Sequence, residues 1–327
     1  MMSTTVAVTG ANGLVGSNLI RLLLSKGYNV KALIHHHSNA LKGLDIEIIK
    51  GDILDKEVLT RLFSNTDIVF HAAAIISIGE FPYQTVYKTN VEGTKTVFST
   101  AKKLGVKTLV HISSIHALQN PKPGIPCTEN CRLTVDSSFS YEKTKALAQQ
   151  WLQQQKGNGI KIVVLNPTAI VGPHDYKPSF IGELVSNILY KKLPAIINGG
   201  YNWVDVRDVA EAALSAAEKG VDGDNYIVGG YWLSLPDLIS LMEQITGLRL
   251  LPPILPFWLA RVGVPFLKLW SKITGNRPLY THESLQIIRN SNKNIVSEKA
   301  SKVLGYTARP TEQTLRDTLD WMRNNNF

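Results

Sequence analysis

The chain has 327 residues, of which 44% are hydrophobic and 19% are charged, a balance that excludes a disordered, collagen-like or coiled-coil protein. At roughly 150 residues per domain, this length predicts two domains or one large α/β unit with an appendage. The net charge is +9, and residues 247–327 hold 12 Lys/Arg against 5 Asp/Glu, which is +7 of that total. This bias suits an anionic ligand, a membrane surface or a merely solvated basic face. No basic run or zinc-finger spacing indicates nucleic acid.

The cysteines and the most apolar segment bear on the cellular compartment in which the protein acts. Cys127 and Cys131 are the two cysteines, and their C-x3-C spacing differs from zinc and thioredoxin patterns, so we expect free thiols in a reducing compartment. The N-terminus enters a strand without a signal-peptide pattern. Residues 252–270 are the most apolar stretch, but Arg261, Lys268 and four prolines make them a poor transmembrane span. We expect a soluble, cytoplasmic protein whose weak peripheral membrane contact, if it has one, lies in that segment.

The first 165 residues alternate short β-branched runs with longer helical patterns, as in a doubly wound parallel sheet. The runs are almost continuously apolar, as strands buried on both faces of such a sheet must be. A helix over Leu14–Lys26 is closed by Gly27 at the expected C-cap position. The predicted strands are Thr5–Thr9, Val30–Ile34, Ile46–Ile49, Ile68–His71, Thr108–Ile112 and Ile160–Leu165.

Beyond Pro167 the sequence changes character. Prolines and glycines cluster up to residue 200, residues 204–219 predict a helix, and 225–228 predict one more strand. Further helices are predicted at 235–246, 256–274, 280–289, 297–304 and 311–324.

These elements predict an α/β protein of two parts. Residues 1–165, together with about 204–230, form a Rossmann-type dinucleotide-binding domain. A smaller, mostly helical C-terminal substrate-binding region is formed by 166–203 and 231–327. This region would lie over the carboxyl edge of the parallel sheet, where ligands bind in open α/β folds.

A G-x-x-G-x-x-G turn at Gly10, Gly13 and Gly16 joins the first strand to the first helix. Glycines allow the tight turn and the close approach of backbone to a pyrophosphate, and the helix N-terminus offers free N–H groups to phosphates. Glycine turns also serve purely structural ends. The position of this one, at the first strand–helix junction, predicts a dinucleotide site.

The end of the second strand bears on the choice of cofactor. An acid there would bind the ribose 2′-hydroxyl of NAD, whereas a base accommodates the 2′-phosphate of NADP. The chain reads His35-His36-His37-Ser38, with no acid before Asp45. This favours NADP and leaves NAD open. Consecutive residues of an extended segment point in alternating directions, so we expect no metal on the three histidines.

A Y-x-x-x-K pattern, Tyr141 to Lys145, lies on a predicted helix that follows the fifth strand. Residues four apart share a helix face, so the ammonium would lie beside the phenol. A free phenol, with a pKa near about 10, is a poor acid-base group at neutral pH. A neighbouring ammonium, together with the positive nicotinamide ring, would stabilise the phenolate, lower that pKa and activate the tyrosine. The fifth strand ends at Ser113 and Ser114; we favour Ser114 as a hydrogen-bond donor to a substrate carbonyl, over two hydroxyls that merely cap the strand.

Together these motifs resemble the extended short-chain dehydrogenase/reductase family, within the NAD-dependent epimerase/dehydratase superfamily. The end of the second strand and the tail around 275–306 resemble the branch that contains dihydroflavonol 4-reductases and 3β-hydroxysteroid dehydrogenases, although these reductases usually have arginine where His35 stands. The matching segments span nearly the whole chain: TGANGLVG at 9–16, GDI at 51–53, HAAA at 71–74, NVEGT at 90–94, the serine pair, Y-x-x-x-K, NP at 166–167, VGP at 171–173, VDVRDV at 204–209 and KASKVLGY at 299–306.

The resemblance implies a role for each matching residue. Ser114, Tyr141 and Lys145 would be catalytic. Asp52 and Ile53 would contact the adenine. The full set implied for the cofactor is Gly10, Asn12, Gly13, Leu14, Gly16, His35, Asp52, Ile53, Ala72, Ala73, Tyr141, Lys145, Pro167 and Ile170.

We therefore expect an NADP-dependent oxidoreductase that transfers a hydride between nicotinamide and a ketone, aldehyde or secondary alcohol, with a fairly apolar substrate. One alternative is a nucleotide-sugar epimerase or dehydratase with tightly bound NAD, although no clear basic pair for a diphosphate follows Gly172. Another is a redox-sensing regulator that binds NADP without turnover, against which the intact triad argues. The expected partners are a small carbonyl or alcohol and a second copy of the chain in a homodimer.

Overall fold

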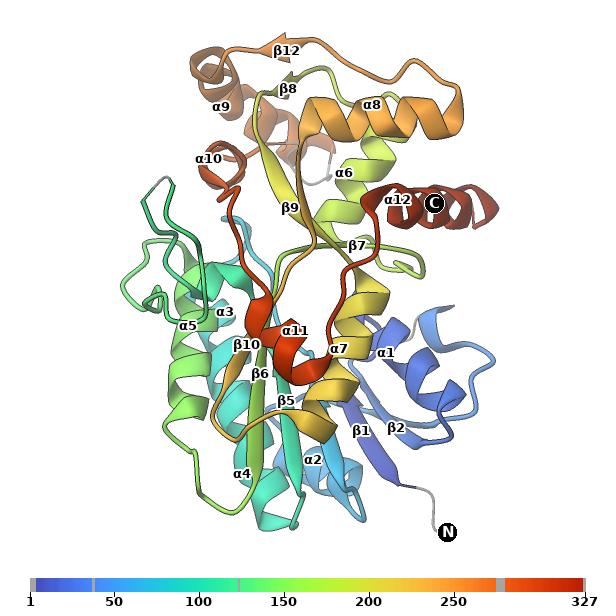
Figure 1. The fold of residues 1–327 in the computed structure, drawn as a ribbon, viewed down its shortest axis with the longest axis vertical. Helices are drawn as coiled ribbons and strands as arrows, with labels where there is room; N and C mark the ends of the chain where they lie inside the picture. Colours follow the sequence, from blue (N-terminus) through green and yellow to red (C-terminus); the bar gives the residue numbers. More distant parts are fainter. Residues whose placement is uncertain (1–3, 37–38, 123, 275–279, 326–327) are drawn as a thin grey trace.

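The central feature of the structure is a seven-stranded sheet in which every neighbouring pair is parallel. The computed structural model describes residues 4–36, 39–122, 124–274 and 280–325, without the side chains of 266–274 and 282. The strands are β1 (Thr5–Thr9), β2 (Asn29–Ile34), β3 (Glu47–Lys50), β4 (Ile68–His71), β5 (Thr108–Ile112), β6 (Lys161–Pro167) and β10 (Asn225–Val228). In their order, β10-β6-β5-β4-β1-β2-β3, the chain builds outward in one direction from β1 and in the other from β4 (Figure 1). Ligands of open α/β sheets bind at the carboxyl ends of the two strands that flank such a switch point.

Helices cover both faces of this sheet because its strands are apolar on both sides. One face is packed by α1 (Leu14–Ser25), α7 (Val206–Lys219) and α11 (Glu298–Leu304). The other is packed by α2 (Lys56–Phe63), α4 (Gly93–Lys103) and α5 (Ser140–Gln153). A short helix, α3 (Tyr83–Tyr87), and a π-helical turn, Lys88–Glu92, lead into α4. We call these strands and helices the sheet half.

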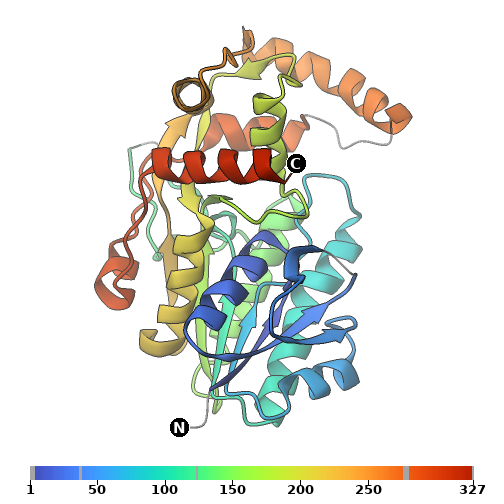
Figure 2. The same ribbon diagram turned by 90° about the vertical axis from the view of Figure 1, so that its right-hand side faces the viewer.

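The cap, residues 169–205, 231–274, 280–290 and 311–325, lies beyond the carboxyl edge of the sheet (Figures 1 and 2). Its hydrophobic core is separate from those on the two faces of the sheet and includes the fully buried Trp203. Its helices are α6 (Phe180–Leu189), α8 (Leu235–Thr246), α9 (Phe257–Thr274), α10 (His282–Asn290) and α12 (Thr311–Asn324). Its strands are β7 (Ala169–Val171), β8 (Ile196–Ile197), β9 (Gly200–Asp205), β11 (Tyr231–Ser234) and β12 (Ile254–Leu255).

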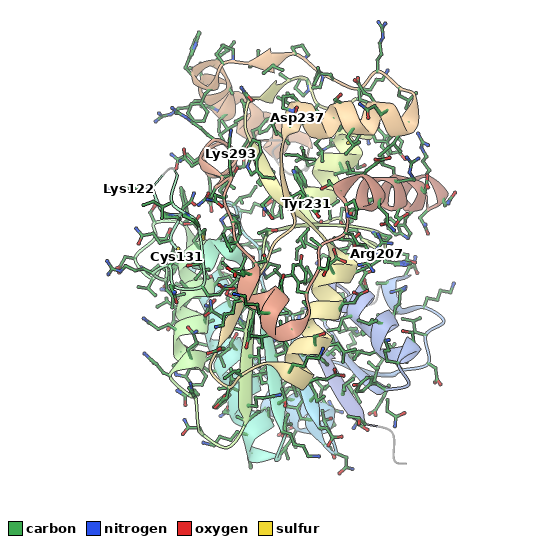
Figure 3. All side chains as sticks on the ribbon, viewed as in Figure 1. Lys122, Cys131, Arg207, Tyr231, Asp237 and Lys293 are labelled. Atoms are coloured by element: carbon green, nitrogen blue, oxygen red, sulfur yellow. The ribbon has the colours of Figure 1, made fainter. Side chains whose placement is uncertain are left out.

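Ion pairs at the start of α7 join the two halves. Arg207 lies where α7 meets the cap (Figure 3). Its guanidinium contacts Asp205 at 2.6 Å and reaches Asp317 of α12 at 2.7 Å. The next residue, Asp208, pairs with Arg309, which precedes α12. The side chains of Asp205 and Asp208 are almost completely buried, so these pairs neutralise charge that would otherwise be costly at the junction.

The prediction of a Rossmann-type α/β fold is confirmed, and each predicted strand of the sheet is present within two residues of its expected bounds. The helix predicted over 204–219 begins at Val206, because Val204 and Asp205 finish β9. Five short strands of the cap, including β9, were not predicted. Among the described residues, no helix is both long and apolar enough to cross a membrane.

Candidate active site

The glycine turn between β1 and α1 forms one end of the site. Gly10 adopts a positive φ of 71°, and a Cβ on it would lie 2.6 Å from the backbone of Ala72, so only glycine fits. Helix α1 begins at Leu14, and its N-cap residue, Gly13, provides no side-chain cap for the first N–H groups. Dinucleotide phosphates require such free N–H groups next to a glycine-rich backbone that they can approach closely. The turn therefore fits the cofactor that the sequence predicts.

One cavity of about 740 Å³ runs from this turn to the cap. Ten of the predicted site residues line it: Gly10, Gly13, Leu14, Gly16, Ala72, Ser114, Tyr141, Lys145, Pro167 and Ile170. The other five, Asn12, His35, Asp52, Ile53 and Ala73, do not line it. The cavity thus brings the phosphate turn and the three predicted catalytic side chains into one space.

Ser114 and Tyr141 meet across this cavity. Ser114 follows β5, and Tyr141 occupies the first turn of α5, so both lie at the carboxyl edge of the sheet. Their side chains share a hydrogen bond. The neighbouring hydroxyl, that of Ser113, instead donates to Gln149 Oε1 at 2.8 Å and is buried. The geometry thus leaves Ser114, and not Ser113, beside the phenol.

Lys145 lies one helical turn beyond Tyr141 and is 3% exposed. Its Nζ donates a hydrogen bond of 2.7 Å to the carbonyl oxygen of Ile112. Burial lowers the pKa of Lys145 to about 7, because a dry environment penalises the charged amine.

Burial also raises the pKa of Tyr141 to about 12, against the opposite effect of its hydrogen bond with Ser114. The sequence led us to expect a lowered phenol pKa, and the chain alone does not produce one. Because Lys145 is buried and Tyr141 is only partly exposed, the cost of burying a charge dominates the pKa of both groups. The tyrosine is consequently protonated at neutral pH.

A network of amides and hydroxyls holds α5 against the sheet. Asn90, in the π-helical turn, exchanges two hydrogen bonds with the backbone of Ile75 and donates to Thr144 Oγ1 at 3.1 Å. Gln149 Oε1 accepts from Asn166 at 2.8 Å, in addition to its bond with Ser113. The network fixes the register of the helix that carries Tyr141. The sequence did not place Asn90 in the site, since such long-range partners leave no local pattern.

The end of β2 forms a separate polar cluster. His35 Nδ1 and His36 Nε2 lie 2.7 Å apart, and His35 Nε2 lies 3.8 Å from Asp52 Oδ2. Asn12 donates to the carbonyl oxygen of His36 at 2.6 Å, which ties this cluster to the glycine turn. Ile53, by contrast, is buried and packs against the start of α4 at Gly93. His37 and Ser38 lie outside the described residues, and the described residues contain no group of ligands that could hold a metal.

Apolar side chains form the walls of the cavity furthest from the glycine turn. The segment after β4 contributes Ile75, Ile76, Ile78 and Phe81, α6 contributes Phe180, Ile181 and Leu184, and α10 contributes Ile287 and Ile288. Among the described residues that line the cavity, two are lysines, Lys145 and Lys177, and none is arginine. Sequence reasoning had named none of these wall residues, because they come from three segments far apart in the chain.

Comparison with known proteins identifies the family. Residues 6–229 match the model of the NAD-dependent epimerase/dehydratase family. The chain belongs to this family. The match begins in β1 and ends just after β10, so it covers the whole sheet, the glycine turn and the Ser114–Tyr141–Lys145 set.

Members of the family with similar sequences include reductases. A protein of Synechocystis sp. that carries the name dihydroflavonol 4-reductase is 31% identical over 100% of this chain and 96% of its own. A 4-hydroxy-2-methyl-3-oxo-4-farnesyl-3,4-dihydroquinoline-1-oxide ketoreductase of Stigmatella aurantiaca is 29% identical over 95% and 94%. The crystal structure of gox2253 is 29% identical, covers 99% of both chains and superposes with a TM-score of 0.84. The present chain is an NAD(P)-dependent oxidoreductase of the extended short-chain dehydrogenase/reductase type.

Proposed function

We propose that the protein reduces an apolar ketone or aldehyde with NADPH. The observation that carries this proposal is the position of Ser114 and Tyr141 in one cavity between a glycine turn and a set of apolar walls. A carbonyl oxygen beside the two hydroxyls would have its carbon within reach of a nicotinamide that extends from the turn.

The side chains of the site divide the chemistry among them. The bound cofactor supplies the hydride. Tyr141, which is protonated at neutral pH, gives its proton to the carbonyl oxygen, and Ser114 donates a hydrogen bond to the negative charge that develops there. Lys145, anchored to Ile112, holds the nicotinamide ribose and favours the phenolate left after proton transfer. A phenol that keeps its proton until the carbonyl arrives suits reduction.

The cofactor proposal extends to the end of β2. We assign the 2′-phosphate of NADP to His35 and its neighbours, because imidazoles can donate hydrogen bonds to a phosphate that a carboxylate would repel. Asp52, 3.8 Å from His35, would meet the adenine with Ile53 nearby. Gly10, Asn12, Gly13, Leu14 and Gly16 would hold the diphosphate, and Ala72, Ala73, Pro167 and Ile170 would line the rest of the dinucleotide.

The substrate proposal follows from the walls. Phe180, Ile181 and Leu184 present a continuous apolar surface that a sugar diphosphate could not use. A nucleotide diphosphate needs cations, and Lys177 is the one basic residue on the described wall besides Lys145. The farnesyl group in the name of the ketoreductase relative is in keeping with a substrate of this kind. These points support a reductase over a nucleotide-sugar epimerase or dehydratase.

The test is a panel of ketones, aldehydes and secondary alcohols, followed by the absorbance of the reduced nicotinamide, with NADPH and NADH compared. We expect turnover of apolar ketones with NADPH. Nucleotide released from the purified, denatured protein is measured in parallel. Stoichiometric NAD that does not exchange, without carbonyl turnover, would instead favour the epimerase alternative; exchangeable NADP without turnover would favour a redox sensor.

The proposal also includes a homodimer and a place in the cytoplasm. Cys127 is buried and Cys131 half-buried, both as free thiols, which suits a reducing compartment. Light scattering during size-exclusion chromatography measures the oligomeric state, and fractionation of the source cells measures the location.

A further inference from the structure

Helix α9 is apolar on two faces, although only one of them is covered. Phe257, Ala260 and Val264 follow helical spacing and pack into the core of the cap, where Val264 is fully buried. The outward positions Trp258, Leu259 and Val262 are 66%, 39% and 58% exposed. A surface helix normally turns polar residues outward. The outer face of α9 therefore needs a partner other than the core.

Three further apolar side chains extend this surface along the chain before α9. Leu248, Leu251 and Ile254 are each more than two-fifths exposed. Ile254 belongs to β12, which pairs with β8 at Ile196. The segment before α9 is thereby tied to the segment that follows α6. We name these six exposed residues, Leu248, Leu251, Ile254, Trp258, Leu259 and Val262, the end patch. It lies at the end of the cap opposite the N-terminus (Figure 1).

The charge around the end patch is mostly positive. Between Glu243 and Glu283 the sequence contains no acidic residue and five basic ones, Arg249, Arg261, Lys268, Lys272 and Arg277. Arg249 and Arg261 are exposed, and so are Lys191 and Lys192, which follow α6 and precede β8. The side chain of Glu243 is engaged by the backbone N–H groups of Leu250 and Leu251.

We propose that the end patch docks onto an anionic phospholipid bilayer. An exposed tryptophan with apolar neighbours suits the headgroup level of a membrane, and a surrounding excess of cations suits anionic lipids. A second copy of this chain would bring the same excess of positive charge to the interface, so charge favours the lipid over a symmetric dimer at this surface.

The docked orientation bears on the substrate, and this step rests on the proposed function. Helix α6 lines the cavity with Phe180 and Leu184, and the chain runs on from it to β8, which pairs with β12 of the patch. Helix α10, which packs against α9, lines the cavity with Ile287. The two helices therefore connect the membrane surface with the apolar walls. A carbonyl compound dissolved in the bilayer could enter the cavity without crossing bulk water.

The experiment is cosedimentation of the whole protein with vesicles, without cofactor or substrate. Vesicles of phosphatidylcholine alone are compared with vesicles of equal parts phosphatidylcholine and phosphatidylglycerol, at low and high salt. The variants are Trp258→Ser, Val262→Ser and Arg261→Gln. Val221→Ser is the matched control, because Val221 is 49% exposed and lies in the loop between α7 and β10. Melting temperatures verify that each variant is folded.

We expect wild type and Val221→Ser to bind the anionic vesicles equally, and high salt to release both. Trp258→Ser should weaken binding by about tenfold and Val262→Ser and Arg261→Gln by a few-fold, the range expected for single interfacial residues. Absent binding, or binding that Trp258→Ser leaves unchanged, overturns the proposal. So does a dimer in solution that Trp258→Ser converts to monomer. Turnover of a water-soluble ketone without vesicles tests the proposed function separately, because docking is not needed for it.

Discussion

Helices α5 and α6 face the same cavity from the two halves of the molecule, but they present opposite chemistry to it. From α5 come Tyr141 and Lys145, two groups able to exchange protons, and from α6 come Phe180, Ile181 and Leu184. The α5 side is held by hydrogen bonds through Thr144, Lys145 and Gln149, whereas the wall residues of α6 are held by apolar packing.

The difference teaches where reaction and selection are decided. A side chain fixed by hydrogen bonds to two strands has one position for every substrate, as proton transfer requires. The free energy of binding that an apolar wall contributes grows in proportion to the substrate surface it covers, so its effect varies with the substrate. Substitutions on α5 should therefore affect all substrates alike, and substitutions on α6 should discriminate among them.

The largest effect is expected for Tyr141→Phe. The substitution removes the proton donor and leaves the apolar ring in place, so turnover should fall by roughly 10²–10⁴-fold for every substrate, with little change in NADPH binding. Steady-state kinetics and a fluorescence titration of NADPH measure the two quantities. Tyr231→Phe is the control, since Tyr231 is 51% exposed and lies on β11 of the cap (Figure 3). Tyr141→Phe turnover above half of the wild-type rate would show that the phenol is not the proton donor.

Leu184→Ser should discriminate among substrates. A hydroxyl in the apolar wall weakens contact with an apolar ketone, and a loss of about 10–200-fold in kcat/KM is the range for a change of this size in a hydrophobic pocket. A small ketone that does not reach α6 should be unaffected, and Leu184→Met should restore most of the loss. Equal losses for large and small ketones would mean that α6 contributes stability and not selection.

The two halves also differ in how well their elements follow from the sequence. Strands of the sheet were predicted because a strand buried on both faces is a short, continuous apolar run, as at β5. Strand β9 contains the fully buried Trp203, yet its partner β11 starts almost 30 residues later, and no local pattern shows the pairing. Strands β8 and β12 have two residues each and are defined only by one another.

The candidate site follows the same division. Positions fixed by local geometry, such as Gly10 in its turn and Tyr141 four residues before Lys145, can be recognised from spacing alone. The pKa of Tyr141 in the chain alone is raised and could not be derived from spacing, because it depends on burial by segments remote in the sequence. The apolar segment 252–270 divides similarly: Phe257 packs inward and Trp258 points outward, while the side chains of Phe266, Leu269 and Trp270 lie outside the described residues.

A third prediction concerns the outer rim of the sheet half, where His35 lies. His35→Asp would place a second carboxylate beside Asp52, and we expect NADP affinity to fall by about tenfold, equivalent to 1.4 kcal/mol, while NAD binding holds or improves. Asn29→Asp, at the opposite end of β2, adds the same charge away from the site and serves as the control. Isothermal titration with both cofactors measures the change. An unaltered preference would move the 2′-phosphate to residues 36–38.

The last prediction concerns the pH dependence of stability, and it tests whether the α5 side of the cavity is as dry as the wall opposite. The folded protein lowers the pKa of Lys145 from 10.5 to about 7 by burial. Between these two values the unfolded chain binds a proton that the folded chain does not, so the free energy of unfolding rises with pH across this window. Chemical denaturation between pH 7 and pH 9 should show this rise, and Lys145→Met should make it shallower.

Lys161→Met is the matched control for that comparison. Lys161 also donates to a backbone carbonyl oxygen, that of Ala217 at 2.6 Å, but it lies at the start of β6, at the opposite edge of the sheet from the cavity. The slope in this variant should equal that of wild type. If Lys145→Met also keeps the wild-type slope, water reaches Lys145 freely in the folded protein. The α5 side of the cavity would then be polar and solvated, while the α6 side would be apolar and dry. Tyr141 would act in contact with solvent.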